Sequence, residues 1–250
     1  MLFTIYPKKP NHAPSQAQLQ ERINNQKITT SVFTESLKKL IKNKAFVIHV
    51  IAYGACFGVS SSSAVVLSQF NISHRDAHNE ASRMGLPMTL IGMVGSILIG
   101  LILDQTHKYK ETVFAVCLLS TLSTVWLLFA LEYQSKWMIY FTIGAFSFFV
   151  NAYWPAGIEF AMEITFPSSE STTTGILLAV SRISELIFTL ILSVINFKYG
   201  AVWAVAAQVV ILLTATLLTY WTPNNLRRQE AFRKNVEFEK VPQEDEIFNN

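Results

Sequence analysis

Charged residues are scarce in this chain. Only 15% of its 250 residues are Asp, Glu, Lys or Arg, whereas soluble domains carry about 25%. Two cysteines are too few for a disulfide scaffold, and ten glycines and eight prolines exclude collagen and a disordered low-complexity chain. The net charge of +3 is small and its basic residues are scattered, so the sequence does not indicate a nucleic-acid binder.

Patterns that carry catalysis are missing as well. The sequence has no nucleophile–histidine–acid set, no glycine-rich phosphate loop and no Cys/His spacing typical of a metal site. We therefore expect neither an enzyme nor a bound cofactor or metal.

Apolar sequence is abundant instead. Hydrophobic residues make up 51% of the chain, and the mean hydropathy is +0.33. A bilayer core about 30 Å thick needs roughly 20 helical residues, and six apolar runs have that length: 45–68, 84–103, 112–131, 137–160, 174–195 and 201–221. The sequence thus predicts an all-α membrane fold, with a six-helix bundle at 44–222 between a segment at 1–43 and a tail at 223–250.

Lys and Arg residues favour one side of the predicted bundle. Eight precede the first span, five lie in the tail and two lie in the joint between the second and third spans, against four on the opposite side. By the positive-inside rule both termini are cytoplasmic. The first outward loop then holds Asn71-Ile72-Ser73, an acceptor triplet that predicts glycosylation of Asn71.

A short motif closes the second span. Gly100 permits close helix packing, Asp104 can cap the helix or form a salt bridge across the joint, and Lys108 faces the cytosol. The pattern resembles the Gly-x-x-x-Asp-x-x-x-basic loop of the major facilitator superfamily, which lies between the second and third helix of each six-helix half and works as a conformational latch. The alternative is a basic turn that contains Gly and Asp by chance.

A longer resemblance covers the fourth and fifth spans. The run from Asn151 to Pro167 contains Tyr153-Trp-Pro155-Ala-Gly157 followed by Glu159-Phe-Ala-Met-Glu163-Ile-Thr165. It is similar to the same stretch of the feline leukaemia virus subgroup C receptor-related transporters, facilitator carriers linked to choline, ethanolamine and heme. The resemblance extends over nearly the whole chain but only to the C-terminal half of that family. It implies that 1–43 is the central loop of a full-length carrier.

Two ionisable residues lie in the middle of the fifth span. Arg182 and Glu185 are three residues apart, on one helical face, and either pair with each other or place Arg182 in a cavity facing an anionic group. The resemblance implies that Arg182 stands where choline-transporting relatives carry a Gln. A guanidinium repels a quaternary ammonium, so Arg182 weakens choline as the solute and favours a carboxylate or phosphate, with heme still allowed.

Other polar and aromatic residues in the spans are candidates for the cavity wall or for ordinary packing. Tyr53 matches a cavity-facing Tyr of the relatives, Tyr153 offers an aromatic face, and Asn151 is expected to form a hydrogen bond across helices. Glu159 and Glu163, one turn apart near the cytoplasmic end, are expected to act as a gate rather than to touch the solute. Pro155 permits a kink between these two groups.

These features predict one bundle of a solute carrier that works by alternating access around a midplane site. Its partners are a small organic solute, the lipid bilayer, and a missing N-terminal six-helix half or a second chain. The apolar start Met1–Tyr6 resembles the end of a preceding helix, so we expect an incomplete gene model or a shortened isoform. The alternative is a half-length protein that binds or regulates a full-length relative without transporting. The family likeness favours the plasma membrane.

Overall fold

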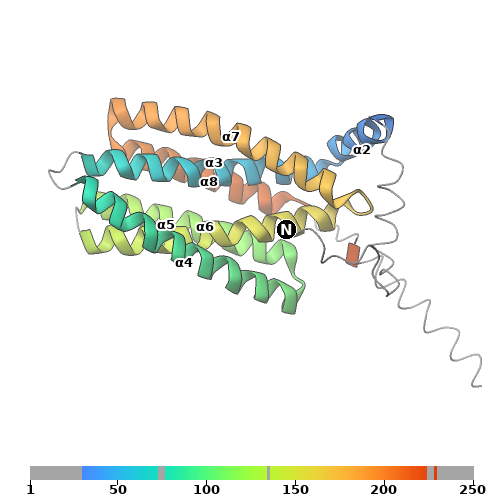
Figure 1. The fold of residues 1–250 in the computed structure, drawn as a ribbon, viewed down its shortest axis with the longest axis horizontal. Helices are drawn as coiled ribbons and strands as arrows, with labels where there is room; N and C mark the ends of the chain where they lie inside the picture. The colour runs from blue at the N-terminus through green and yellow to red at the C-terminus, as the bar shows by residue number, and fades with distance from the viewer. Residues whose placement is uncertain (1–29, 73–76, 134–135, 224–227, 230–250) are drawn as a thin grey trace, which may run out of the picture.

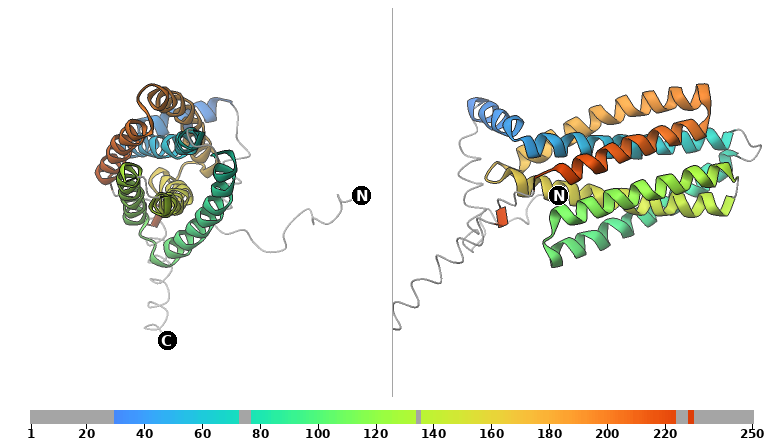
Figure 2. Two further views of the ribbon diagram at one scale, coloured as in Figure 1. Left: turned by 90° about the vertical axis from the view of Figure 1, so that its left-hand side faces the viewer. Right: turned by 180° about the vertical axis from the view of Figure 1, so that it is seen from behind.

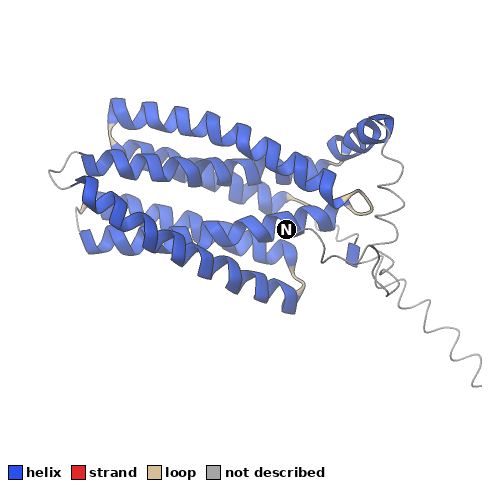
Figure 3. Cartoon of the chain, viewed as in Figure 1, coloured by secondary structure: helices blue, strands red, loops and turns tan. Residues whose placement is uncertain are grey.

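The computed structural model of the chain describes residues 30–72, 77–133, 136–223 and 228–229. All regular secondary structure in these ranges is helical, and the helices are joined by short loops (Figure 3). A short helix, α2 (Thr30–Lys42), comes before six longer ones (Figure 1). These are α3 (Lys44–Ile72), α4 (Ala77–Thr106), α5 (Tyr109–Glu132), α6 (Lys136–Thr165), α7 (Glu170–Tyr199) and α8 (Ala201–Trp221).

The helices extend beyond most of the predicted spans. The largest difference lies between the predicted spans 45–68 and 84–103, where α3 continues to Ile72 and α4 already begins at Ala77. Polar residues can continue a helix past the bilayer core, because the helical backbone bonds do not depend on apolar side chains. The segment predicted at 1–43 also contains α2, which carries an ion pair one turn apart between Lys39 Nζ and Glu35 Oε1 at 3.0 Å.

Five helices of the described chain are long and apolar enough to cross a membrane, by length and composition: α3, α4, α5, α7 and α8. The fourth predicted span is helical in the structure as α6, but α6 does not meet this criterion. Its apolar run is interrupted by Asn151, Pro155, Glu159 and Glu163. Five of the six predicted spans are therefore supported.

The helix α6 runs through the middle of the bundle, as the end-on view in Figure 2 shows. It packs mainly against α4 and α5, while α3 packs mainly against α7 and α8. The outward faces are apolar: Leu90 and Ile97 of α4 are both 60% exposed, and Leu186 and Leu190 of α7 are 67% and 68% exposed. Such faces suit contact with lipid or with other membrane helices, not with water.

Small residues bring α4 against α6. A Cβ atom at Gly92 would collide with the side chain of Asn151, and one at Gly95 would collide with the backbone carbonyl of Phe148. The close packing expected at Gly100 is not seen among the described residues, since a Cβ there would meet no atom within 4 Å, and it stays a prediction. This part of α4 still packs on the core, because Leu103 is 3% exposed, but Gly100 lies next to Leu101, which is 54% exposed.

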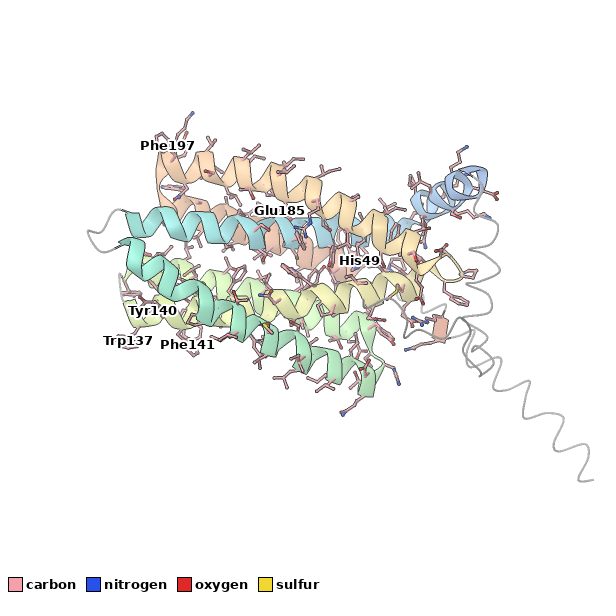
Figure 4. The ribbon with its side chains drawn as sticks, in the orientation of Figure 1. His49, Trp137, Tyr140, Phe141, Glu185 and Phe197 are labelled. Carbon is pink, nitrogen blue, oxygen red and sulfur yellow. The ribbon has the colours of Figure 1, made fainter. Side chains whose placement is uncertain are left out.

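The two ends of the bundle differ. Aromatic side chains gather at one end, where Trp137 and Phe197 are 86% and 88% exposed and Tyr140 and Phe141 lie close by (Figure 4). Exposed aromatic residues of this kind are typical of the membrane–water interface. The opposite end, here called the tail end, holds α2, the α4–α5 joint and residues 228–229.

Candidate functional site

An aromatic stack joins α3 to α6 inside the bundle. The rings of Tyr53 and Tyr153 stack with centroids 5.6 Å apart, and those of Phe57 and Trp154 stack at 4.7 Å. Tyr53, Tyr153 and Phe57 are buried, with 1%, 1% and 4% of their surfaces exposed. The structure therefore brings the two predicted tyrosines together, in a stack that keeps both away from the surface.

Side chains of α3 also hold the backbone of α6 next to Pro155. His49 Nε2–H donates to the carbonyl of Gly157 at 2.8 Å, and the Tyr53 hydroxyl donates to the carbonyl of Trp154 at 3.3 Å. A carbonyl only accepts, so the proton of neutral His49 is on Nε2. Its Nδ1 is buried and has no hydrogen-bond partner in the described part of the chain.

Gly157 is required for this arrangement. A Cβ atom there would lie 2.5 Å and 2.6 Å from Cδ2 and Cε2 of Tyr53, inside van der Waals contact. The Tyr53 ring thus rests directly on the backbone of α6. We call His49, Tyr53, Trp154 and Gly157 the α3–α6 clamp; it holds α6 at the position where Pro155 removes a helical hydrogen bond.

Arg182 and Glu185 form an ion pair on the face of α7. Arg182 Nη1 lies 2.8 Å from Glu185 Oε2, so in the structure the two residues pair with each other. The guanidinium also lies over the Phe57 ring, with Cζ 4.8 Å from the centroid. The Arg182 side chain is 66% exposed and that of Glu185 27%. Figure 4 labels Glu185 of this pair. The ion pair thus lies midway along α7, with the aromatic face of Phe57 as a neighbour.

Asn151 lies on a different face of α6, against α4. Its Nδ2 donates to the carbonyl of Ser147 at 2.8 Å and to Ser147 Oγ at 3.2 Å, so the expected hydrogen bond across helices is wrong for Asn151 itself. The link is made one step further along, where Ser147 Oγ donates to the carbonyl of Met88 on α4 at 2.8 Å. The side chain of Asn151 packs against Gly92 of α4, but its amide donates within its own helix, α6.

The latch residues lie at the tail end. Asp104 is exposed and forms no ion pair with another described residue, so its predicted salt bridge across the joint is not seen there. Lys108 Nζ, just before α5, pairs instead with Glu111 Oε2 in the first turn of that helix, at 3.5 Å. Glu159 is half-buried, and Glu163 is 2% exposed.

Residues 228–229, which follow α8, contact the tail end of the bundle. The backbone N–H of Gln229 donates to Glu163 Oε2 at 3.3 Å, and Gln229 Nε2 donates to the carbonyl of His107 at 2.7 Å. Arg228 Nη2 lies 3.2 Å from Glu170 Oε1. These three interactions, here called the tail contact, join the tail to the α4–α5 joint, α6 and α7.

Two further sequence-based expectations concern sites elsewhere. Asn71 lies in the last turn of α3, but its side chain lies outside the described residues, so its glycosylation stays a prediction. Cys56 and Cys117 are free thiols; they are buried, and their sulfur atoms lie 3.5 Å apart. Within the described ranges, no group of three or more His, Cys, Asp or Glu side chains is placed to hold a metal ion.

Sequence reasoning missed two residues that the structure places in these sites. Phe57, whose ring contacts the Arg182 guanidinium, lies one turn after Tyr53, and that spacing could have indicated it. Arg228 belongs to a basic run in the tail, and nothing in the sequence indicates that it meets Glu170.

The fold and the site together define a class: a multi-pass membrane protein with an aromatic stack inside a helical bundle and an ion pair on the face of α7 beside it. No protein-family model matches the chain. Its sequence is 33% identical over 233 residues to the choline/ethanolamine transporter flvcr2b of Danio rerio, covering 92% of the chain and 47% of the relative. It is 31% identical over 251 residues to the choline/ethanolamine transporter FLVCR2 of Homo sapiens, covering 100% of the chain and 47% of the relative.

A more distant relative is an uncharacterized MFS-type transporter of Caenorhabditis elegans, 29% identical over 232 residues, with 92% of the chain and 39% of the relative covered. These similarities confirm the resemblance to the C-terminal half of a facilitator-superfamily transporter of the feline leukaemia virus subgroup C receptor-related type. The chain spans about half the length of the relatives it matches.

Proposed function

We propose that the chain forms one six-helix bundle of a carrier that moves a small organic solute across the plasma membrane by alternating access. The proposal includes α6 as the sixth span and places both termini in the cytoplasm, as the distribution of Lys and Arg favours. Relatives named as choline/ethanolamine transporters support a transport role. The regulatory alternative has no observation of its own in its favour.

The Arg182–Glu185 pair is the observation that carries the proposal. An ionisable side chain at the centre of a membrane helix costs about 2.5–3.5 kcal/mol on insertion scales. The Arg182 side chain is nevertheless 66% exposed on the outer face of α7. A position this costly in lipid is consistent with a face that borders a water-filled cavity instead.

A cavity needs a second wall. The matched relatives are about twice as long as the chain, so we assign the other wall to a second six-helix bundle, supplied by a missing N-terminal half or by a second chain. The apolar outer faces of α4 and α7 offer the surface on which that bundle would pack.

The α3–α6 clamp and the tail contact then have distinct roles. The clamp keeps the buried aromatic stack, whose Phe57 ring lies under the Arg182 guanidinium, fixed relative to α6 near Pro155. The tail contact, together with Asp104 and the Glu159–Glu163 pair, lies where the cytoplasmic gate of the carrier opens and closes. We assign Gly100 and Lys108 to the same gate on the strength of the latch motif alone.

The solute is an amino alcohol such as choline or ethanolamine, or an anionic compound such as heme. The Arg182 guanidinium occupies the Phe57 face, which a quaternary ammonium would otherwise use. That contact weakens choline and favours a solute with a carboxylate or phosphate group.

Uptake into proteoliposomes tests the proposal. Vesicles carrying the chain with the N-terminal half of the Danio rerio relative flvcr2b are expected to take up radiolabelled choline, ethanolamine or an anionic solute saturably, above vesicles with either half alone. The Arg182→Gln variant is expected to raise choline uptake relative to the anionic solute. An absence of saturable uptake of every solute contradicts the transport role; no change with Arg182→Gln removes Arg182 from the cavity.

A further inference from the structure

The groups around Arg182 are those that would bind an organic cation. Phe57 offers an aromatic face backed by the Trp154 ring at 4.7 Å, and Glu185 offers a carboxylate that is 27% exposed. Aromatic faces and carboxylates are the usual partners of a quaternary ammonium. In this chain the guanidinium of Arg182 already holds both, at 4.8 Å from the Phe57 centroid and 2.8 Å from Glu185 Oε2.

A simple cation is a poor replacement for Arg182. To reach Phe57 and Glu185 it must displace the guanidinium, and it has no anionic group with which to compensate. The displaced Arg182 would be left unpaired beside an apolar helix, where an uncompensated charge is costly. A simple anion leaves the reverse problem: it takes Arg182 away from Glu185 and leaves that carboxylate unpaired.

A zwitterion exchanges partners without leaving a charge unpaired. Its anionic group takes Arg182, and its ammonium takes the Phe57 face and Glu185. Arg182 is able to make this move because its side chain is 66% exposed, whereas Phe57 is buried in the stack and stays in place. The paired charges of Arg182 and Glu185 are only 2.8 Å apart, which suits a compact solute whose opposite charges are a few bonds apart.

We propose that this site takes a small zwitterion with a quaternary ammonium and a carboxylate, with Arg182 as the residue that selects it over choline. The inference rests on the proposed function, because it names the solute class of the same site. The Arg182 guanidinium occupies the cation position at Phe57 and Glu185 until the anionic group of the solute binds it and draws it away.

Binding measurements in lipid nanodiscs test the inference on the chain assembled with the N-terminal half of the Danio rerio relative flvcr2b, which supplies the second wall of the cavity. Glycine betaine is the zwitterion, choline the cation and acetate the anion, and nanodiscs with the N-terminal half alone are the blank. The chain is expected to bind glycine betaine at least about tenfold more tightly than choline or acetate, since a charged hydrogen-bonded pair contributes about that factor. Arg182→Gln is expected to lose this factor for glycine betaine without weakening choline.

Two further variants separate the charge of Arg182 from loss of the fold. Arg182→Lys keeps the charge and is expected to keep the preference for glycine betaine, at reduced strength. Lys198→Gln removes an exposed cation from the far end of α7 and is expected to change nothing. The thermal unfolding midpoint of each variant shows that it is folded.

The outcomes are distinct. Choline binding as tight as glycine betaine, acetate binding as tight as glycine betaine, or an equal effect of Arg182→Gln on all three overturns the zwitterion inference while leaving a solute site in place. Binding of none of the three by the folded assembly of the chain and the N-terminal half overturns the proposed site and the inference with it.

Discussion

Adding one methyl group at Gly157 tests the α3–α6 clamp. The Cβ of Gly157→Ala would lie 2.5 Å from the Tyr53 ring and 3.8 Å from His49 Cε1. Tyr53 cannot turn aside freely, because it is 1% exposed and stacked on Tyr153. Overpacking of a buried site costs about 1–3 kcal/mol, whereas replacing a helical Gly by Ala gains up to about 1 kcal/mol.

Gly175→Ala is the matched control. A Cβ at Gly175 meets no atom within 4 Å, so this variant receives the helix gain without the clash. The difference between the two variants therefore isolates the Tyr53 contact, at about 1–3 kcal/mol. For a chain of this size that corresponds to a gap of about 2–12 °C between their thermal unfolding midpoints in detergent, with Gly157→Ala the lower. Equal midpoints would refute the close approach of Tyr53 to α6.

Two other parts of the structure give predictions of their own. Glu170→Gln removes the partner of Arg228, and limited trypsin digestion is expected to cut after Arg228 faster than in the wild type or in the control Glu111→Gln; equal rates would show that the tail contact does not hold the tail. The thiols of Cys56 and Cys117 lie 3.5 Å apart, so diamide is expected to oxidise them to a disulfide between α3 and α5. In this reaction diamide takes two electrons and two protons from the thiols and is reduced to its hydrazine. Mass spectrometry is expected to detect the product as one cross-linked peptide. Recovery of both thiols unmodified would show that the two helices do not meet as described.

Much of the helix plan follows from the sequence, because a run of about 20 apolar residues has few other uses. The fourth span shows the limit of that argument. Asn151, Pro155 and Glu159 lower the apolar character of α6, and its central position, in contact with α4 and α5, is what accommodates them. Hydropathy alone does not specify where α6 lies in the bundle.

The site was predictable only in part. The Arg182–Glu185 pair follows from spacing along one helix, and the structure contains it. The Phe57–Arg182 contact depends on how α3 and α7 are rotated against each other, which a single sequence does not specify. The same holds for Gly100, where the motif predicts close packing but no described atom lies within 4 Å of a Cβ.

The environment of Arg182 is the most direct test of the account. Arg182→Cys and Leu213→Cys place a thiol on α7 and on α8, at positions that are both exposed in the bundle. In membranes carrying the chain together with a second six-helix bundle, the account predicts that a charged, membrane-impermeant thiol reagent modifies Cys at 182 and that bound solute slows the reaction, while Cys at 213 in lipid does not react. Failure of the reagent to modify position 182 would place that face of α7 in lipid and contradict the solute cavity.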